Sequence, residues 1–351
     1  MAVLQADKIG IAFGDKQILT EASLVVGDKE RIGMVGRNGS GKSTFLNCLT
    51  GELVPDRGTV SIPSGVYLGY LEQLPEHSPD ATAWDVVMAS FGQILEQRRQ
   101  LRELEQQLAA GGPDLDRVLE QYAKVSHAYE MADGYACEAT ARRILLGLGF
   151  SENQFKQPWT VFSGGERTRL NLGCLLAKEP RLLLLDEPTN NLDVDAVEWL
   201  EDYLITYSGA MLVVSHDRMF LDRVCTRIVE LRDGCLKSYP GNYSDYVKLK
   251  KEEGIANQRA YEKQQAYIKK TEDYILRFKA GIKAKQARGR QSQLNRLKRI
   301  ERVAPQKAIS PGHIKMDQES AGEVVVLKNI SKSFAGRQLF DRVNLTIYKG
   351  T

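Results

Sequence analysis

The sequence predicts an α/β fold of the phosphate-loop type, in which helices flank a largely parallel sheet. The first observation is the loop 36–44, GRNGSGKST, which fits the pattern G-x-x-x-x-G-K-[ST] between an apolar run and a helical run. The second is a later alternation of short apolar runs with helical patterns, of which the four leucines 182–185 are the clearest. Such sheets bind their ligands at the carboxyl ends of the strands, so we expect the functional residues there.

The overall composition is ordinary for a soluble globular protein of about two domains. Of its 351 residues, 42% are hydrophobic and 26% are charged. Apolar runs such as 182–185 are too short to cross a bilayer, and the first residues lack the basic and apolar parts of a signal peptide. The five cysteines form no C-x-x-C pair, which indicates reduced thiols. We therefore expect a cytoplasmic protein without a membrane partner.

The glycine-rich loop predicts a nucleotide site. Glycine lets the backbone approach a phosphate closely, and the N–H groups at the start of the following helix attract an anion. Lys42 is expected to reach the β- and γ-phosphates, and the Ser43 hydroxyl to bind Mg²⁺. The predicted nucleotide-binding residues of this loop are Gly36, Arg37, Asn38, Gly39, Ser40, Gly41, Lys42, Ser43 and Thr44.

Two further groups carry the predicted chemistry. Asp186 and Glu187 end the leucine run, where plain surface charge is the competing interpretation. Asp186 is expected to hold Mg²⁺ through water, and Glu187 to orient or deprotonate the attacking water.

The sequence Ser-Gly-Gly-Glu opens a later helix whose N-terminus can bind an anion. Its residues, also predicted to contact nucleotide, are Ser163, Gly164, Gly165 and Glu166.

A helical arm is expected to interrupt the first domain. From residue 83 apolar residues recur every seven positions in one helix, and a second helix follows residues 111–113. The spacing fits an antiparallel hairpin over 84–130 and two core helices equally well. The run 96–107, which is polar apart from its leucines, favours the projecting hairpin. The first domain then comprises 1–83 and 131–240.

Positive charge is concentrated after this domain. Residues 245–305 contain 17 Lys and Arg against seven Asp and Glu, whereas the remainder has 31 basic and 38 acidic residues. We expect residues 241–322 to form a long basic helical linker, bent at Gly281 or Gly289, followed by a connector. Solvated helices normally interleave both signs, so the linker is expected to contact a nucleic-acid backbone, with a solvated helix pair as the alternative. Charge alone does not separate RNA from DNA. The predicted contacts are Lys279, Lys283, Lys285, Arg288, Arg290, Arg296, Lys298 and Arg299.

The last residues of the sequence repeat the first. An offset of 321 positions places Ile9 on Ile330 and Phe13 on Phe334. On this offset a second phosphate loop would begin near position 357, a few residues past Thr351. Residues 323–351 are therefore expected to be the start of a second, incomplete nucleotide-binding domain.

Taken in order, the motifs resemble those of the ATP-binding cassette superfamily. They are 36–44 (Walker A), Gln73 (Q-loop), 162–166 (signature), 182–187 (Walker B), 191–193 (D-loop) and His216 (switch). Residues 188–193, 215–218 and 239–244, with the arm and the basic linker, further resemble the ABC-F subfamily, in which one chain carries two cassettes. Asn191 departs from the usual His of the D-loop motif, and Phe162 from the Leu that opens the signature.

This resemblance implies ATP and Mg²⁺ as ligands and a role for each motif residue. Phe13 would stack on adenine, although a buried turn residue is the alternative reading. Gln73 would sense Mg²⁺ and the attacking water, and His216 would hydrogen-bond the γ-phosphate. The implied catalytic residues are Glu187, His216 and Gln73, the implied metal-site residues are Ser43, Gln73 and Asp186, and Asp193 joins the nucleotide-binding set.

The resemblance also implies a cellular role. In cassette proteins the signature of one cassette closes on ATP held by the phosphate loop of another, so this chain alone would bind ATP but hydrolyse it poorly unless it self-associates. In ABC-F proteins the linker reaches toward the peptidyl-tRNA on the ribosome, and the arm touches ribosomal RNA or protein. The leading hypothesis is therefore an ATPase that regulates translation or protects the ribosome. The alternatives are the ATPase subunit of an ABC transporter, which the arm and basic linker disfavour, and a DNA-repair ABC ATPase.

Overall fold

The computed structural model of the protein describes residues 2–71, 78–111, 114–278, 284–297, 299, 323–334 and 337–348. Four residues with predicted roles lie outside these ranges: Gln73, Lys279, Lys283 and Lys298. The chain divides into two compact units, 1–256 and 257–351. None of the described helices combines the length and the apolar character needed to span a membrane.

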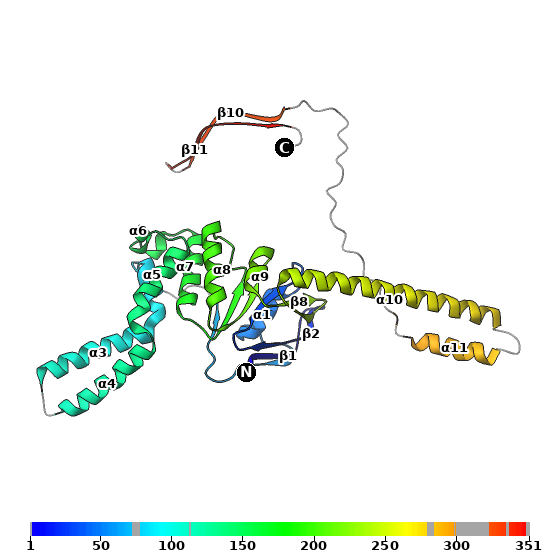
Figure 1. Cartoon of the computed structure of the whole chain (residues 1–351), viewed down its shortest axis with the longest axis horizontal. Coiled ribbons are helices and arrows are strands. Elements are labelled where there is room, and N and C mark those ends of the chain that lie inside the picture. Colours follow the sequence, from blue (N-terminus) through cyan, green and yellow to red (C-terminus); the bar gives the residue numbers. More distant parts are fainter. Residues whose placement is uncertain are drawn as a thin grey trace. The chain divides into compact units, whose positions relative to one another are not determined.

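A six-stranded sheet forms the centre of the first unit (Figure 1). Its order is β5-β6-β7-β3-β8-β9, and all neighbouring strands are parallel except β8 and β9. The strands are β3 (Arg31–Val35), β5 (Leu68–Tyr70), β6 (Leu182–Asp186), β7 (Ala210–Val214), β8 (Arg227–Arg232) and β9 (Cys235–Pro240). The carboxyl ends of β3, β6 and β7 meet at one edge, which gathers the residues that follow each strand.

Helix α1 (Lys42–Thr50) lies between this sheet and a smaller antiparallel sheet. The smaller sheet has the order β2-β1-β4 and consists of β1 (Ala2–Phe13), β2 (Lys16–Gly27) and β4 (Arg57–Ser61). Leucines 182 and 184 of β6 face α1, whereas leucines 183 and 185 face the opposite side, as the pleat of a strand requires. One cluster thus joins β1, β2, α1 and the central sheet, and includes Leu4, Ile9, Leu19, Leu24, Phe45, Leu46, Leu182 and Leu184.

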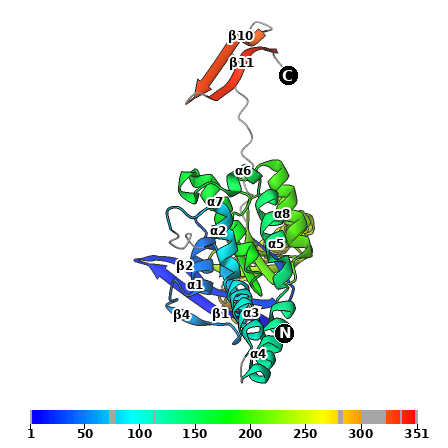
Figure 2. The ribbon, with the colours of Figure 1, turned by 90° about the vertical axis from the view of Figure 1, so that its left-hand side faces the viewer.

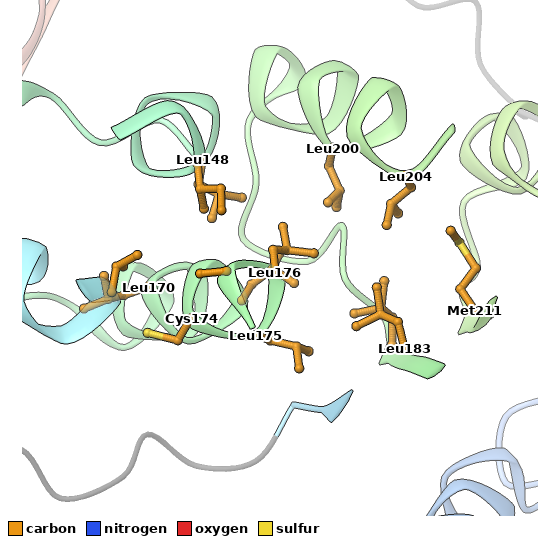
Figure 3. Packing of buried hydrophobic residues seen from close by; sticks show 14 of the residues in the cluster. Leu148, Leu170, Cys174, Leu175, Leu176, Leu183, Leu200, Leu204 and Met211 are labelled. Carbon is orange, nitrogen blue, oxygen red and sulfur yellow. The ribbon is translucent and has the colours of Figure 1, made fainter. Parts of the chain in front are cut away.

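Helices cover the other face of the central sheet (Figure 2). They are α2 (Ala83–Met88), α5 (Cys137–Gly147), α6 (Glu152–Phe155), α7 (Gly164–Ala177), α8 (Val194–Thr206) and α9 (Arg218–Val224). Figure 3 shows Leu176 of α7 with Leu200 and Leu204 of α8 above Leu183 and Met211 of the strands. Short 3-10 turns occur at Ala89–Phe91, Gly134–Ala136 and Trp159–Val161.

The arm is an antiparallel pair of helices, α3 (Gly92–Ala110) and α4 (Leu115–Met131), which extends from the sheet (Figures 1 and 2). Leu101, Leu104 and Tyr129 are buried along it, and the Tyr122 hydroxyl donates to Glu105 at 3.2 Å. The prediction of one continuous helix from residue 83 is wrong, because the 3-10 turn separates α2 from α3. Helix α2 packs into the cassette core, so the projecting part begins at residue 92 rather than 84.

Two helices follow the cassette. Helix α10 (Tyr243–Phe278) starts within the first unit and continues into the second, where α11 (Ala284–Arg296) also lies. Of the two positions predicted for a bend, Gly289 is inside α11 and Gly281 lies outside the described residues, so the bend stays a prediction. The Tyr274 hydroxyl hydrogen-bonds to Gln286 at 3.1 Å, which holds the two helices side by side.

The strands β10 (Glu323–Phe334) and β11 (Arg337–Tyr348) repeat the geometry of β1 and β2 with every bound shifted by 321 positions. The pairing of Ile9 with Ala22 recurs as Ile330 with Val343, and the register shifts recur at equivalent positions. Even a side-chain bond recurs: the Lys8 N–H donates to Ser23 at 2.8 Å, and the equivalent Asn329 N–H to Asn344 at 2.7 Å. The two hairpins are therefore one structural motif used twice.

Candidate nucleotide site

The loop between β3 and α1 has a conformation that its glycines make possible. Gly39 and Gly41 have φ of 73° and 100°, which side chains rarely adopt. A Cβ at Gly41 would lie 2.5 Å from Ile18, so this position also lacks room for a side chain. The Lys42 side chain is only 9% exposed, and its ammonium group donates to the carbonyls of Gly36 at 3.1 Å and Arg37 at 3.3 Å. The loop thus holds a buried positive charge at the start of a helix.

Ser43 and Asp186 come together although 143 positions separate them in the sequence. The Ser43 hydroxyl donates to the Asp186 carboxylate at 2.8 Å, because α1 starts where β6 ends. Hydroxyl and carboxylate oxygens are ligands that Mg²⁺ prefers. Burial and the Asp186 charge raise the pKa of Tyr70, which places the end of β5 beside the same carboxylate.

Glu187 and His216 face one another across the ends of β6 and β7. Glu187 has a φ of 49°, an uncommon conformation for a residue other than glycine. Its N–H donates to the Val214 carbonyl at 2.8 Å, which fixes this turn. The His216 N–H donates to the Glu187 carboxylate at 3.2 Å, and the His216 Nε2 lies 3.5 Å from Glu187 Oε1. The Glu187 carboxylate is therefore held in place through Oε2, while Oε1 accepts no hydrogen bond from any residue that the structure describes.

The unpartnered polar atoms of this edge fit a nucleotide phosphate and Mg²⁺. Within the described part of the chain, Ser40 Oγ and Glu187 Oε1 are buried without a hydrogen-bond partner. Buried polar atoms normally find partners, so their lack here marks a place for a ligand. The described residues also contain no cluster of three or more His, Cys, Asp or Glu side chains able to hold a metal.

The signature residues are tied to one another. Ser163 caps α7, its N–H and hydroxyl donate to Glu166 at 2.9 Å and 2.7 Å, and these bonds lower the pKa of the Glu166 carboxyl. Gln154 donates to the other Glu166 oxygen at 3.2 Å. This assembly forms the N-terminus of α7, with Gly164 and Gly165 in its first turn.

The D-loop residues lie beside the signature helix. A Cβ on Gly165 would lie 3.4 Å from Asn191, and Asp193 caps α8 by accepting from the Ala196 N–H at 2.9 Å. Asn191 has a φ of 66°, a conformation in which Asn and His are both enriched, so Asn in place of His suits the backbone. A cavity of about 170 Å³ lies between α7 and the end of β6. It is lined by residues of α7, of the end of β6 and of the D-loop, including Thr168, Arg169, Asp186, Glu187 and Asn191.

Phe13 lies at the tip of the β1–β2 hairpin. It pairs with Lys16 across the turn, and 53% of its surface is exposed. The alternative reading of Phe13 as a buried turn residue is therefore wrong. An exposed aromatic ring remains available for stacking on a base.

The basic residues of α11 separate into two groups. Lys285, Arg288 and Arg296 are exposed. At about 100° per residue Lys285 and Arg296 lie opposite the buried Ala287 and Leu294, and Arg288 lies beside Lys285. The Arg290 guanidinium, also exposed, lies 3.8 Å over the Tyr274 ring and so takes part in helix packing. Arg299 is exposed beyond the end of the helix.

Sequence reasoning missed one group of residues altogether. Asp222, Glu230 and Lys250 attach α10 to the cassette next to the nucleotide site. No motif contains them, and their only common feature in the sequence is charge. The contacts of these residues depend on the packing of α10 against β8 and α9, which no local sequence pattern indicates.

Comparisons with known proteins agree with this geometry. Residues 19–190 match a family model described as ABC transporter, and residues 229–310 match an extension model with the same description. The chain belongs to the ATP-binding cassette family, and the predicted α/β phosphate-loop fold is confirmed. The predicted enzyme class, an ATP hydrolase, is the class of this family.

Named relatives include members of the F group. The protein YdiF of Bacillus subtilis is 35% identical over 353 residues, which cover 100% of this chain and 55% of YdiF. ABC transporter F family members 2 and 5 of Arabidopsis thaliana are 33% and 34% identical, over 99% and 95% of this chain and 52% and 49% of their own lengths. The chain therefore spans about half the length of these relatives. A solved ATP-binding subunit of an ABC transporter aligns over 68% of this chain and 90% of its own, with a TM-score of 0.49 and 20% identity.

Proposed function

We propose that the chain binds ATP with Mg²⁺ at the phosphate loop and is part of an ABC-F-type ATPase that acts on the ribosome. The observation that carries the nucleotide part is the 2.8 Å bond between Ser43 and Asp186, beside the buried Lys42. In this proposal Lys42 exchanges its loop carbonyls for the β- and γ-phosphates. Ser43 and Asp186 hold Mg²⁺, with Gln73 as a third contact, and the ion neutralises phosphate charge.

In this proposal hydrolysis is carried out by Glu187 and His216, whose positions are held by backbone hydrogen bonds at the ends of β6 and β7. Glu187 orients or deprotonates the attacking water through Oε1, which accepts no hydrogen bond from the described residues and lies 3.5 Å from His216 Nε2, and His216 hydrogen-bonds the γ-phosphate. Phe13 stacks on the adenine. ATP closes two cassettes on each other, and hydrolysis releases them.

The second cassette is a separate part of the proposal. Ser163, Gly165 and Glu166 would close on ATP held by another cassette, and Lys42 needs the signature of that partner. The repeated hairpin β10–β11 supports such a domain, because its geometry matches the edge of the first cassette. In β2, Leu24 is 4% exposed under α1, whereas its equivalent Leu345 is 48% exposed. On this view the chain comprises a cassette (1–91 and 132–240), an arm (92–131), a linker (241–322) and the start of a second cassette.

The ribosome is proposed as the binding partner because of the basic charge of the linker and the names of the relatives. Lys285, Arg288 and Arg296 form one exposed basic face on α11, which suits a phosphate backbone. The arm and linker would contact ribosomal RNA and the peptidyl-tRNA. Two relatives bear the name ABC transporter F family member, which supports this group over a transporter subunit.

Ribosome co-sedimentation tests the proposal. The chain is incubated with ribosomes and a non-hydrolysable ATP analogue, with ADP, or without nucleotide, and parallel samples contain duplex DNA. We expect the chain to pellet with ribosomes most strongly with the analogue. Equal or stronger binding to DNA would favour a repair-associated ATPase. Ribosome binding that is absent, or that ignores nucleotide, contradicts the proposal.

A further inference from the structure

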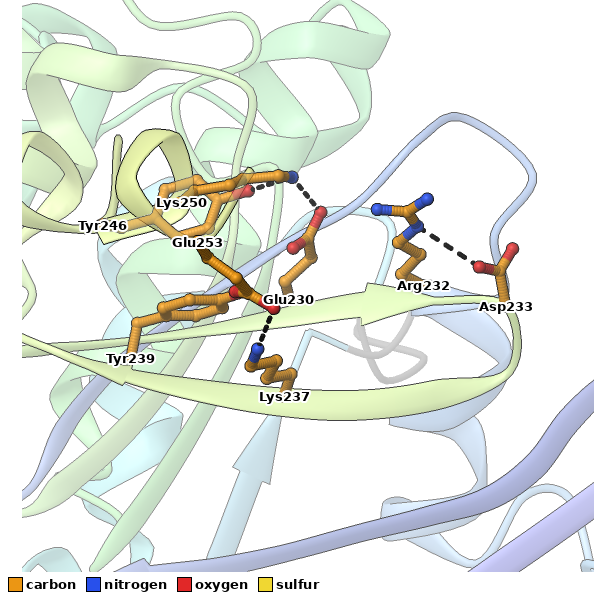
Figure 4. A network of polar contacts seen from close by, with 8 residues as sticks. All are labelled: Glu230, Arg232, Asp233, Lys237, Tyr239, Tyr246, Lys250 and Glu253. Carbon is orange, nitrogen blue, oxygen red and sulfur yellow. Dashed lines mark hydrogen bonds and ion pairs between the residues drawn. The ribbon is translucent and has the colours of Figure 1, made fainter. Parts of the chain in front are cut away.

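The first turns of α10 are attached to α9 and β8 at two points. At its N-terminus the Ser244 N–H donates to the Asp222 carboxylate at 2.6 Å. Farther along, the Lys250 ammonium pairs with Glu230 and donates to the Tyr246 hydroxyl at 2.8 Å (Figure 4). Glu230 is 9% exposed and Tyr246 is 6% exposed, whereas the Lys250 side chain is 29% exposed, so the carboxylate of this second attachment is buried and its ammonium group partly buried.

Both partners belong to segments that lie next to nucleotide-site residues. Asp222 lies on α9, which is capped by Asp217, the residue after His216. Glu230 lies on β8 in register with Val35, the residue before Gly36. The strand and the loop touch closely there, because a Cβ on Gly36 would lie 2.8 Å from the Leu231 carbonyl.

We propose that this two-point attachment transmits the occupancy of the nucleotide site to α10. The inference rests on the proposed function, since it requires a nucleotide at the phosphate loop. A ligand that shifts the loop or the switch histidine moves β8 and α9, and the attached turns of α10 follow. Helix α10 is continuous from the cassette to Phe278, and α11, with Lys285, Arg288 and Arg296, follows it in the sequence. Glu230, Lys250 and Asp222 act here as positioning residues.

A buried ion pair suits this role better than an exposed one. Exposed pairs contribute little and break easily, whereas a buried charge that loses its partner is strongly unfavourable. Glu230 and Lys250 therefore stay together when the strand moves. Coupling between sites is reciprocal, so a ligand of α10 would also change nucleotide affinity.

Hydrogen exchange measured by mass spectrometry tests the coupling. Exchange of backbone amides in residues 247–256 is followed with and without Mg²⁺ and a non-hydrolysable ATP analogue, while a fluorescent analogue reports nucleotide binding. In the wild type we expect bound nucleotide to slow this exchange at least about fivefold. In the double variant Glu230→Gln/Lys250→Met nucleotide still binds, but the slowing is lost. Replacing both partners leaves no buried charge unpaired.

The matched control is the double variant Lys237→Met/Glu253→Gln. This pair also joins a strand to α10, but the strand is β9, at the edge of the sheet (Figure 4). The control is expected to keep the slowing. Three results would overturn the coupling: exchange still slows in the variant of Glu230 and Lys250, the slowing is lost equally in the control, or exchange does not slow in a wild type that has bound nucleotide. If the wild type binds no nucleotide, the proposed function fails and the coupling fails with it.

Discussion

Lys42 is a positively charged side chain that is buried against the loop from which it arises. Its ammonium group donates to two carbonyls of that loop, and these bonds hold it where phosphates are expected. The residue type and its place were predicted from the loop pattern. Its burial and bonding partners depend on how the loop closes.

The substitution Lys42→Ala should weaken ATP binding in the presence of Mg²⁺. Hydrogen bonds to charged groups contribute about 1.5–3 kcal/mol each, so we expect a loss of about 10- to 100-fold in affinity. Isothermal titration calorimetry measures this directly. Lys178→Ala removes an exposed lysine beyond the end of α7 and serves as the control. Equal affinities for the two variants would show that the loop is not the phosphate site.

At the scale of an element, the N-terminus of α7 depends on a capping box. Glu166 accepts from the N–H and hydroxyl of Ser163, and its pKa therefore lies below the ordinary 4.5. A carboxyl whose pKa is lowered by folding stabilises the folded state above its unfolded pKa. This contribution is lost as the pH falls through the lowered value.

The variant Glu166→Gln tests this cap through its pH dependence. Gln can still form a capping box but lacks the charge near the helix N-terminus, so we expect a cost of about 0.3–1 kcal/mol at neutral pH. The cost should shrink as the pH falls from 4.5 through the lowered pKa, because folded Glu166 itself becomes protonated over this range. Urea unfolding at neutral and acidic pH measures the difference. A cost that is constant with pH contradicts a contribution from the charge.

The basic face of α11 makes a second prediction at this scale. The triple variant Lys285→Gln/Arg288→Gln/Arg296→Gln should weaken binding to single-stranded RNA and reduce the slope of log K against log salt by about 2. Filter binding at several salt concentrations gives both quantities. The control Lys263→Gln/Lys269→Gln/Lys270→Gln removes equal charge from exposed positions on α10. Equal effects of the two triple variants would show that net charge, not this face, determines binding.

For the whole molecule, hydrolysis should depend on protein concentration. The proposed active site combines the phosphate loop of one cassette with the signature of another. We therefore expect weak ATP turnover per chain that rises with concentration as chains associate. A steady-state assay over a wide concentration range measures this. Vigorous turnover that is independent of concentration contradicts the composite site.

The sequence by itself determined the motif chemistry and the repeat. The loop pattern, the carboxylates after a leucine run and the switch histidine are local signals, because each depends on residues close together in the chain. The offset of 321 positions is likewise visible in the sequence, and the structure shows it again in the bounds of β10 and β11. The motifs can be recognised in the sequence because phosphate binding constrains residue type at fixed spacing.

Only the tertiary structure decided which elements meet. The heptad spacing runs through residues 89–91, yet α2 belongs to the core and α3 to the arm, because burial beside α5 and α7 outweighs helical periodicity. The orientation of α11 likewise separates Arg290 from Lys285, Arg288 and Arg296. The attachment of α10 through Asp222, Glu230 and Lys250 joins residues from three elements. Such contacts depend on packing between distant segments, which no local pattern encodes.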